Sequence, residues 1–218
     1  MTKYLTEAIG TFFLVLTVGC TVIPAAPGVI APLAIGAMLM VMIFAGGHLS
    51  GGHYNPAVTL GAWIRGATPT ADVAPYWVAQ IAGGLAASMV ALFLVGPPKN
   101  PALVPSVAPA FVGEFLFTFA LVYVILNVAT AAATAGNSFF GLAIGMTVMA
   151  GAFAVGGISG GAFNPAVAIG IAIMGLVAPS SIWIHIVSEL LAGVAAALVF
   201  GILHRSQPTK TGAKVSAA

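Results

Sequence analysis

Two copies of an Asn-Pro-Ala triplet are the residues of this sequence best suited to chemistry. They occupy 55–57 and 164–166, within the similar stretches GHLSGGHYNPAVTLG (47–61) and GGISGGAFNPAVAIG (156–170). Asn before Pro favours a helix start, because the Asn oxygen accepts from the first N–H groups and Pro has no N–H to leave unpaired. We therefore expect short helices to begin at Pro56 and Pro165, capped by Asn55 and Asn164.

The two caps could act together on one small molecule. If each Asn oxygen is used by its own helix, both amide NH₂ groups stay free to donate. Each helix N-terminus adds about half an elementary positive charge. Such a point stabilises a neutral species with lone pairs and repels cations and protons. The predicted centre of this site consists of Asn55, Pro56, Ala57, Asn164, Pro165 and Ala166.

The composition is that of a polytopic membrane protein. Of 218 residues, 61% are hydrophobic and 5% charged, and the mean hydropathy is +1.14, which excludes an ordinary soluble protein. The six Lys and Arg residues are too scattered for a nucleic-acid footprint. No metal-ligand cluster and no nucleophile–base pair is evident, so we expect no enzyme activity, no cofactor and no metal.

Six apolar stretches are long enough to cross a bilayer, which takes about 20 residues. They lie at roughly 5–23, 31–47, 76–95, 109–130, 139–156 and 181–203, and Pro-, Gly- and Asn-containing breakers separate them. Two further apolar pieces, about 56–64 and 165–175, are too short to cross.

The chain is an internal duplication. Aligning residue n with residue n+109 pairs 33–61 with 142–170, and 16 of these 29 positions are identical. An offset of 107 pairs Glu7 with Glu114. Each half has three full spans, so the halves have opposite orientations in the bilayer and form an inverted repeat. Non-helical backbone at membrane depth must be buried in protein or line a cavity, so each short piece is expected to re-enter from its own side.

The predicted fold is therefore an all-α membrane protein with six transmembrane helices and two re-entrant half-helices. We expect one membrane domain over 1–205, with repeat 1 at about 3–95 and repeat 2 at about 109–204, and a disordered cytoplasmic tail at 206–218. The positive-inside bias predicts cytoplasmic termini in a plasma (inner) membrane. The cationic residues on that side are Lys3, Arg65, Arg205, Lys210 and Lys214, against Lys99 outside.

The sequence resembles the aquaporins, the major intrinsic protein family, over essentially residues 3–204. The resemblance rests on SGGHYNPAVT (50–59), SGGAFNPAV (159–167), AQIAGG (79–84) and the pairs Glu7/Thr11 and Glu114/Thr118. It implies a right-handed six-helix bundle, passive conduction of water through paired triplets, and a homotetramer with one pore per subunit.

One position departs from the family pattern. Most members carry Arg directly after the second triplet, where this chain has Val167. By the family's spacing the other positions of the outer constriction are Ile35, Gly161 and either Val148, counted from Gly141, or Ala152, counted from Asn164. We therefore expect a wider, more apolar selectivity filter that passes water and small uncharged solutes such as ammonia, urea, carbon dioxide and small polyols.

Other polar residues allow other interpretations. Glu7 and Glu114 could relay protons, but we expect them to bind backbone groups of the re-entrant loops. Glu189, which pairs with Gln80 in the repeat, is interpreted similarly. His48 and His53 could sense pH or line the cytoplasmic vestibule, and are expected instead to support the loop. The alternative function is secondary active transport of a small polar solute by alternating access, since inverted repeats with broken segments also build transporters.

Overall fold

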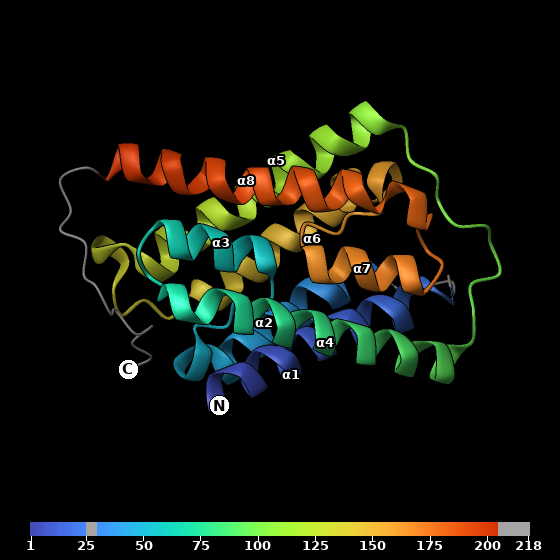
Figure 1. Cartoon of the computed structure of the whole chain (residues 1–218), viewed down its shortest axis with the longest axis horizontal. Coiled ribbons are helices and arrows are strands. Elements are labelled where there is room, and N and C mark those ends of the chain that lie inside the picture. Colours follow the sequence, from blue (N-terminus) through green and yellow to red (C-terminus); the bar gives the residue numbers. More distant parts are fainter. Residues whose placement is uncertain (25–29, 205–218) are drawn as a thin grey trace.

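The computed structural model describes residues 1–24 and 30–204, and every regular element in these ranges is a helix. Six long helices run along the longest axis of the molecule (Figure 1). The predicted tail at 206–218 lies outside the described residues. The long helices are α1 (Thr2–Val22), α2 (Ala31–Ser50), α4 (Thr70–Val95), α5 (Val107–Ile125), α6 (Phe140–Ser159) and α8 (Ile182–Leu203).

Each long helix is apolar and long enough to span a membrane, which confirms the six predicted spans. The span of α5 continues through a π-helical turn, η1 (Leu126–Thr130), and that of α8 starts at a 3₁₀ turn, η3 (Pro179–Ser181). A second 3₁₀ turn, η2 (Ala132–Thr134), follows η1. Helix α4 starts six residues before the predicted position 76, because its first turns are helical although polar.

Helices α2 and α6 each extend three residues past their predicted ends at 47 and 156. Their glycine-containing last turns remain helical and stop only at Gly51 and Gly160, which adopt the left-handed conformation with φ of 92° and 100°. Glycine takes this conformation without steric cost and so ends both helices at equivalent positions.

The two short helices begin where the Asn-Pro pairs predict. They are α3 (Pro56–Ile64) and α7 (Pro165–Ile173), and α7 ends two residues before the predicted position 175. In Figure 1 they lie in the two opposite halves of the bundle, α3 on the left and α7 on the right, and their N-terminal ends face the middle. This is the arrangement of two re-entrant half-helices.

The two repeats interlock. Helix α1 packs on α4 and α5 packs on α8, as the duplication requires, but half-helix α3 packs mainly on α8 and α7 mainly on α4. Helices α2 and α6 cross at Gly36 and Gly145. A Cβ atom on Gly36 would lie 2.6 Å from the Gly145 carbonyl oxygen, and the reciprocal distance would be 2.4 Å. Backbone contact at this crossing therefore requires glycine on both helices.

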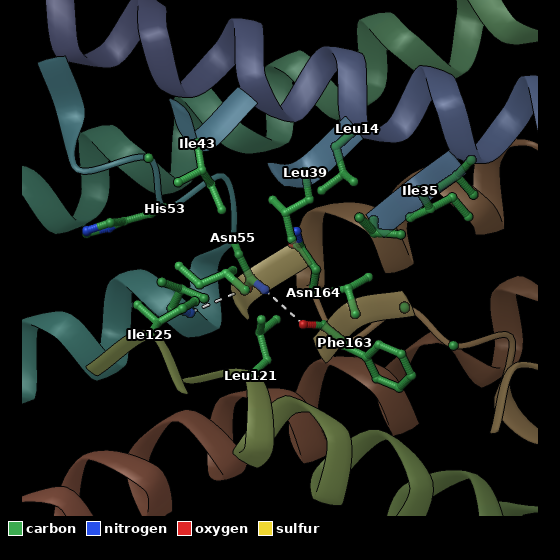
Figure 2. A pocket seen from close by; sticks show the side chains of 18 residues that line it. Leu14, Ile35, Leu39, Ile43, His53, Asn55, Leu121, Ile125, Phe163 and Asn164 are labelled. Carbon is green, nitrogen blue, oxygen red and sulfur yellow. Dashed lines mark hydrogen bonds between the residues drawn. The ribbon is translucent and has the colours of Figure 1, made fainter. Parts of the chain in front are cut away.

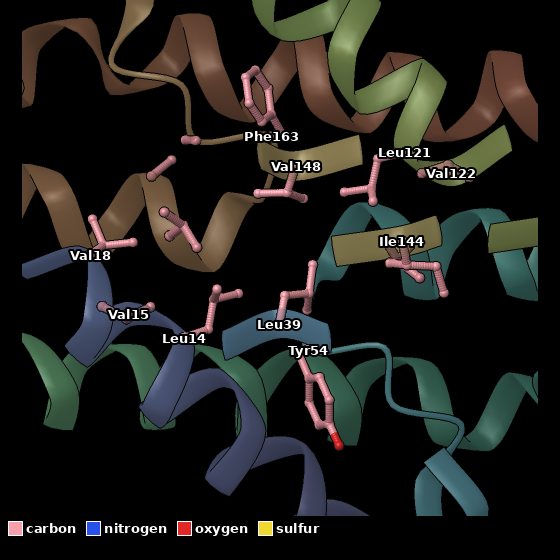
Figure 3. Packing of buried hydrophobic residues seen from close by; sticks show 14 of the residues in the cluster. Leu14, Val15, Val18, Leu39, Tyr54, Leu121, Val122, Ile144, Val148 and Phe163 are labelled. Carbon is pink, nitrogen blue, oxygen red and sulfur yellow. The ribbon is translucent and has the colours of Figure 1, made fainter. Parts of the chain in front are cut away.

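Buried apolar side chains from both repeats fill the centre of the bundle (Figure 3). Val15, Val122, Tyr54 and Phe163 are almost wholly inaccessible there. Large apolar side chains also cover the outer faces, as on α4, where Phe93 is 86% exposed. An apolar exterior around an interior lined from both repeats is suited to a protein surrounded by lipid.

Candidate functional site

The Asn side chains cap the half-helices. Asn55 Oδ1 accepts from the backbone N–H groups of Ala57 (2.8 Å) and Val58 (3.4 Å). Asn164 Oδ1 accepts from the N–H of Ala166 at 2.9 Å. Both residues have extended backbone and are 3% exposed. The capping role predicted from the sequence is therefore present at both triplets.

The amide nitrogens connect the two repeats, which corrects the expectation that both NH₂ groups stay free. Asn55 Nδ2 donates to the Phe163 carbonyl, as the dashed line in Figure 2 shows, and Asn164 Nδ2 donates to the Tyr54 carbonyl, each at 2.8 Å. Each amide group keeps one N–H for another acceptor. The reciprocal bonds fix the separation of the two half-helix N-termini.

The residues before the Asn caps have unusual backbone conformations. Tyr54 and Phe163 have φ of 49° and 50°, in the left-handed region that disfavours bulky residues. Such a conformation costs about 1–3 kcal/mol and persists only where the surroundings enforce it. Here a carboxylate binds each N–H and the opposite Asn binds each carbonyl, so both peptide groups are held from two sides.

Glu7 supports the first re-entrant loop. Its fully buried carboxylate accepts from the Ser50 hydroxyl (2.6 Å), the N–H groups of His53 (3.0 Å) and Tyr54 (2.6 Å), and the Gln80 amide (2.8 Å). Four donors satisfy a buried carboxylate that would otherwise be costly at this depth. These contacts are those of a loop support, and no carboxyl group lines the cavity described below.

Glu114 has the equivalent contacts in the second repeat. Its buried carboxylate accepts from the Ser159 hydroxyl (2.5 Å) and the N–H groups of Ala162 (3.0 Å) and Phe163 (2.8 Å). The loop carrying Gly161 is thus bound to α5 as the first loop is bound to α1. A shared geometry for Glu7 and Glu114 follows from their equivalent positions in the repeat.

His48 does not have the loop contacts that we expected. Its side chain is exposed in the last turn of α2 and makes no hydrogen bond to any described residue. His53, the other histidine considered for this role, lies in the loop, where its Nδ1 is 3.1 Å from the Thr59 hydroxyl and its ring packs edge-on against Tyr76. Burial lowers the pKa of His53, and the Glu7 carboxylate opposes this only in part.

A narrow cavity of about 20 Å³ lies beside the two Asn side chains (Figure 2). One water needs roughly 10–15 Å³ of such space, so the cavity admits molecules of about that size one at a time. Only His53, Asn55 and Asn164 contribute polar side chains to its 18 lining residues. The other lining residues are Leu14, Val18, Ile35, Leu39, Ile43, Gly52, Val58, Leu121, Ile125, Ile144, Val148, Gly161, Ala162, Phe163 and Val167.

Four of the five predicted filter residues line this cavity: Ile35, Val148, Gly161 and Val167. Ala152 does not, although its Cα would lie 3.6 Å from a Cβ built on Gly161. Val148 therefore lines the cavity, whereas Ala152 packs against the second loop at Gly161. The role of these residues as a selectivity filter stays a prediction.

Several residues that line the cavity or bind the re-entrant loops were not predicted individually, but they occupy equivalent positions in the repeat. The offset of 109 relates Ser50 to Ser159, and Leu39 to Val148, which both line the cavity. It also relates Tyr76, whose hydroxyl donates to the Ser50 carbonyl (2.7 Å), to His185, whose Nε2 lies 2.8 Å from the Ser159 carbonyl. Extending the alignment residue by residue would have identified these positions.

Known proteins resemble the chain along most of its length. The family model described as "Major intrinsic protein" matches residues 1–200. A putative aquaporin NIP4-1 of Arabidopsis thaliana is 36% identical over 221 residues, covering 92% of this chain and 74% of the relative. Aquaporin NIP1-3 of Oryza sativa subsp. japonica is 36% identical over 213 residues, with coverage of 92% and 73%.

Among solved structures, the aquaglyceroporin from Plasmodium falciparum has the same fold. It superposes with a TM-score of 0.75 at 20% identity, covering 91% of this chain and 94% of that one. An aquaporin Z of Brucella melitensis is 44% identical over a shorter segment of 68 residues, which is 31% of this chain and 29% of the relative.

Proposed function

The chain belongs to the major intrinsic protein family of membrane channels, and from this premise we propose that it conducts water and uncharged solutes of about the size of water, ammonia first. The observation that carries the proposal is the narrow cavity in which two Asn amides and one His are the only polar side chains among apolar walls.

The apolar walls set the permeant class. A solute in the cavity exchanges its hydration shell for few protein donors, which costs a charged species far more than a neutral one. The two half-helix N-termini add positive potential at the Asn pair and oppose cations further. A neutral molecule with lone pairs accepts one N–H from each Asn and passes.

Val167 distinguishes this cavity from that of most family members. With an isopropyl group where a guanidinium is usual, cation exclusion rests on the helix dipoles and on dehydration, and no cationic donor selects among neutral solutes. Carbon dioxide fits this apolar passage. Urea and small polyols exceed a 20 Å³ space and pass only when side chains such as Ile35 and Val167 rotate outward.

Assembly and orientation complete the proposal. Membership of the family supports a homotetramer in which each subunit has its own pore. The excess of Lys and Arg on one side supports cytoplasmic termini and a plasma (inner) membrane location.

Stopped-flow permeability of proteoliposomes to water, ammonia, urea and glycerol tests this function. We expect water and ammonia fluxes above those of protein-free liposomes, linear in the gradient and with low activation energy. Val148→Trp fills the cavity and abolishes them. Phe153→Trp, on the 60% exposed outer face of the same helix, is the matched control and leaves them unchanged. Saturable or ion-coupled flux would instead establish a transporter.

A further inference from the structure

The polar networks behind the two loops differ at one position. In repeat 1 the fourth donor to Glu7 is the Gln80 amide, which also donates to the Thr59 hydroxyl at 3.0 Å. The offset of 109 replaces Gln80 by Glu189 and Thr59 by Ala168. Repeat 2 therefore has an acid where repeat 1 has an amide, and a methyl group where repeat 1 has a hydroxyl.

Glu189 is wholly buried and accepts no well-aligned hydrogen bond. Its side chain is 0% exposed on α8, and it faces the Glu114 carboxyl and the backbone N–H of Asn164. Neither of its oxygens accepts a hydrogen bond of normal geometry from a described residue. An unpartnered carboxylate at this depth, next to a second one, is the least stable arrangement that the network could adopt.

Two adjacent carboxyl groups without solvent cannot both ionise, because like charges in one site disfavour each other. One bound proton resolves the conflict, since a protonated carboxyl donates through its O–H. The Glu114 oxygen that accepts from Phe163 is the equivalent of the Glu7 oxygen that accepts from Gln80. A donor from Glu189 would restore the missing contact.

His185 is the other titratable group in this network and already has a partner. Its Nε2 lies 2.8 Å from the Ser159 carbonyl, which can only accept, and 3.7 Å from Glu114 Oε1, beyond hydrogen-bonding distance. Its counterpart Tyr76 makes the same carbonyl contact with a neutral hydroxyl. The His185 Nε2–H therefore donates to the Ser159 carbonyl at the end of α6 and gives neither carboxyl group a hydrogen bond.

We propose that Glu114 and Glu189 form a buried proton-binding site, in which Glu189 is a neutral acid that donates its O–H to Glu114. The pair then has a net charge of −1, the same as Glu7 with Gln80. The loop at 159–164 is held by an exchangeable proton, whereas the loop at 51–54 is held by a fixed amide. Glu189 is thus a positioning residue for Gly161 and Asn164, whatever solute the channel conducts.

Infrared spectroscopy tests the proton directly, because the chain has only four acidic side chains. They are Glu7, Asp72, Glu114 and Glu189, and Asp72 is bound by Lys3 and Tyr4. Protein in a maltoside detergent, which has no ester carbonyl, should show one protonated carboxylic C=O stretch at neutral pH that shifts in D₂O. Glu189→Gln should remove this band, and Gln80→Glu should add a second one by creating the same pair in repeat 1.

Permeability tests the positioning role. Glu189→Gln should retain wild-type water flux, because the Gln80 amide donates the equivalent hydrogen bond in repeat 1. Glu189→Leu removes the donor and should reduce the flux. A wild-type spectrum without the acid band, or a band that persists in Glu189→Gln, overturns the proton site, and the wild-type spectrum requires no variant to fold. Equal flux in Glu189→Leu and wild type overturns the positioning role.

Discussion

Replacing Val167 by Arg should restore a barrier to cations. Val167 lines the narrow cavity, so a permeating cation would pass within about 4 Å of a guanidinium at this position. At an effective dielectric constant of 20, two unit charges at that distance repel by about 4 kcal/mol, and at 40 by about 2 kcal/mol. Because each 1.36 kcal/mol is tenfold, methylammonium flux should fall by about 30-fold to 1,000-fold.

Val167→Gln separates charge from bulk in this experiment, because Gln is long and polar but neutral. Uptake of labelled methylammonium and stopped-flow water permeability would be measured on wild type, Val167→Gln and Val167→Arg in the same lipid. Water flux should fall equally in the two variants, and cation flux should fall much further in Val167→Arg. Equal cation flux in the two variants, or no methylammonium uptake by wild type, would refute the electrostatic reasoning.

Three further predictions concern the scaffold. Asn164→Ala removes a helix cap and a buried cross-repeat hydrogen bond, each worth about 1 kcal/mol, and should lower the thermal unfolding temperature in detergent while leaving helix content unchanged. Gly36→Ala should destabilise the protein by about 1–3 kcal/mol through overpacking at the helix crossing. Gly157→Ala is the control, because a Cβ atom at this position would have no atom within 4 Å, and it should stabilise the protein by up to about 1 kcal/mol. Similar effects of the two substitutions on the unfolding temperature would contradict the crossing geometry. Burial lowers the pKa of His53 below 6.5, so His53 binds a proton more readily in the unfolded chain than in the folded one. The stability of the protein should therefore fall as the pH drops below about 6.5. This loss should be smaller in His53→Gln when the melting temperatures of the two proteins are compared at about pH 8 and about pH 5.5.

The local features of the fold follow from the sequence. Asn-Pro pairs determine where α3 and α7 begin, because capping depends only on neighbouring residues. The number of spans follows from hydropathy, and the inverted arrangement from three spans per repeat. These predictions succeed because each rests on a short stretch or on a strong internal alignment.

The residues that line the cavity could not be predicted from the sequence in the same way. Helices α2 and α6 are apolar on all faces, so no periodicity separates Leu39 and Val148, which face the cavity, from Phe44, which is 43% exposed on α2. The cross-repeat bonds of Asn55 and Asn164 join residues far apart in the chain, and no local pattern indicates them. His48 was predicted to support the loop because it stands beside it in sequence, yet its side chain points outward.

The reciprocal Asn bonds also constrain the order of assembly. The carbonyl that accepts from the Asn55 amide lies 108 residues later in the chain, and the amide that donates to the Tyr54 carbonyl lies 110 residues later. At translation rates of about 5–20 residues per second, the first loop spends roughly 5–20 s in the bilayer before its partner has been synthesised. Closure of the pore centre is therefore a late event in biogenesis. Until then, water or the insertion machinery must supply hydrogen-bond partners for the polar groups of the first loop.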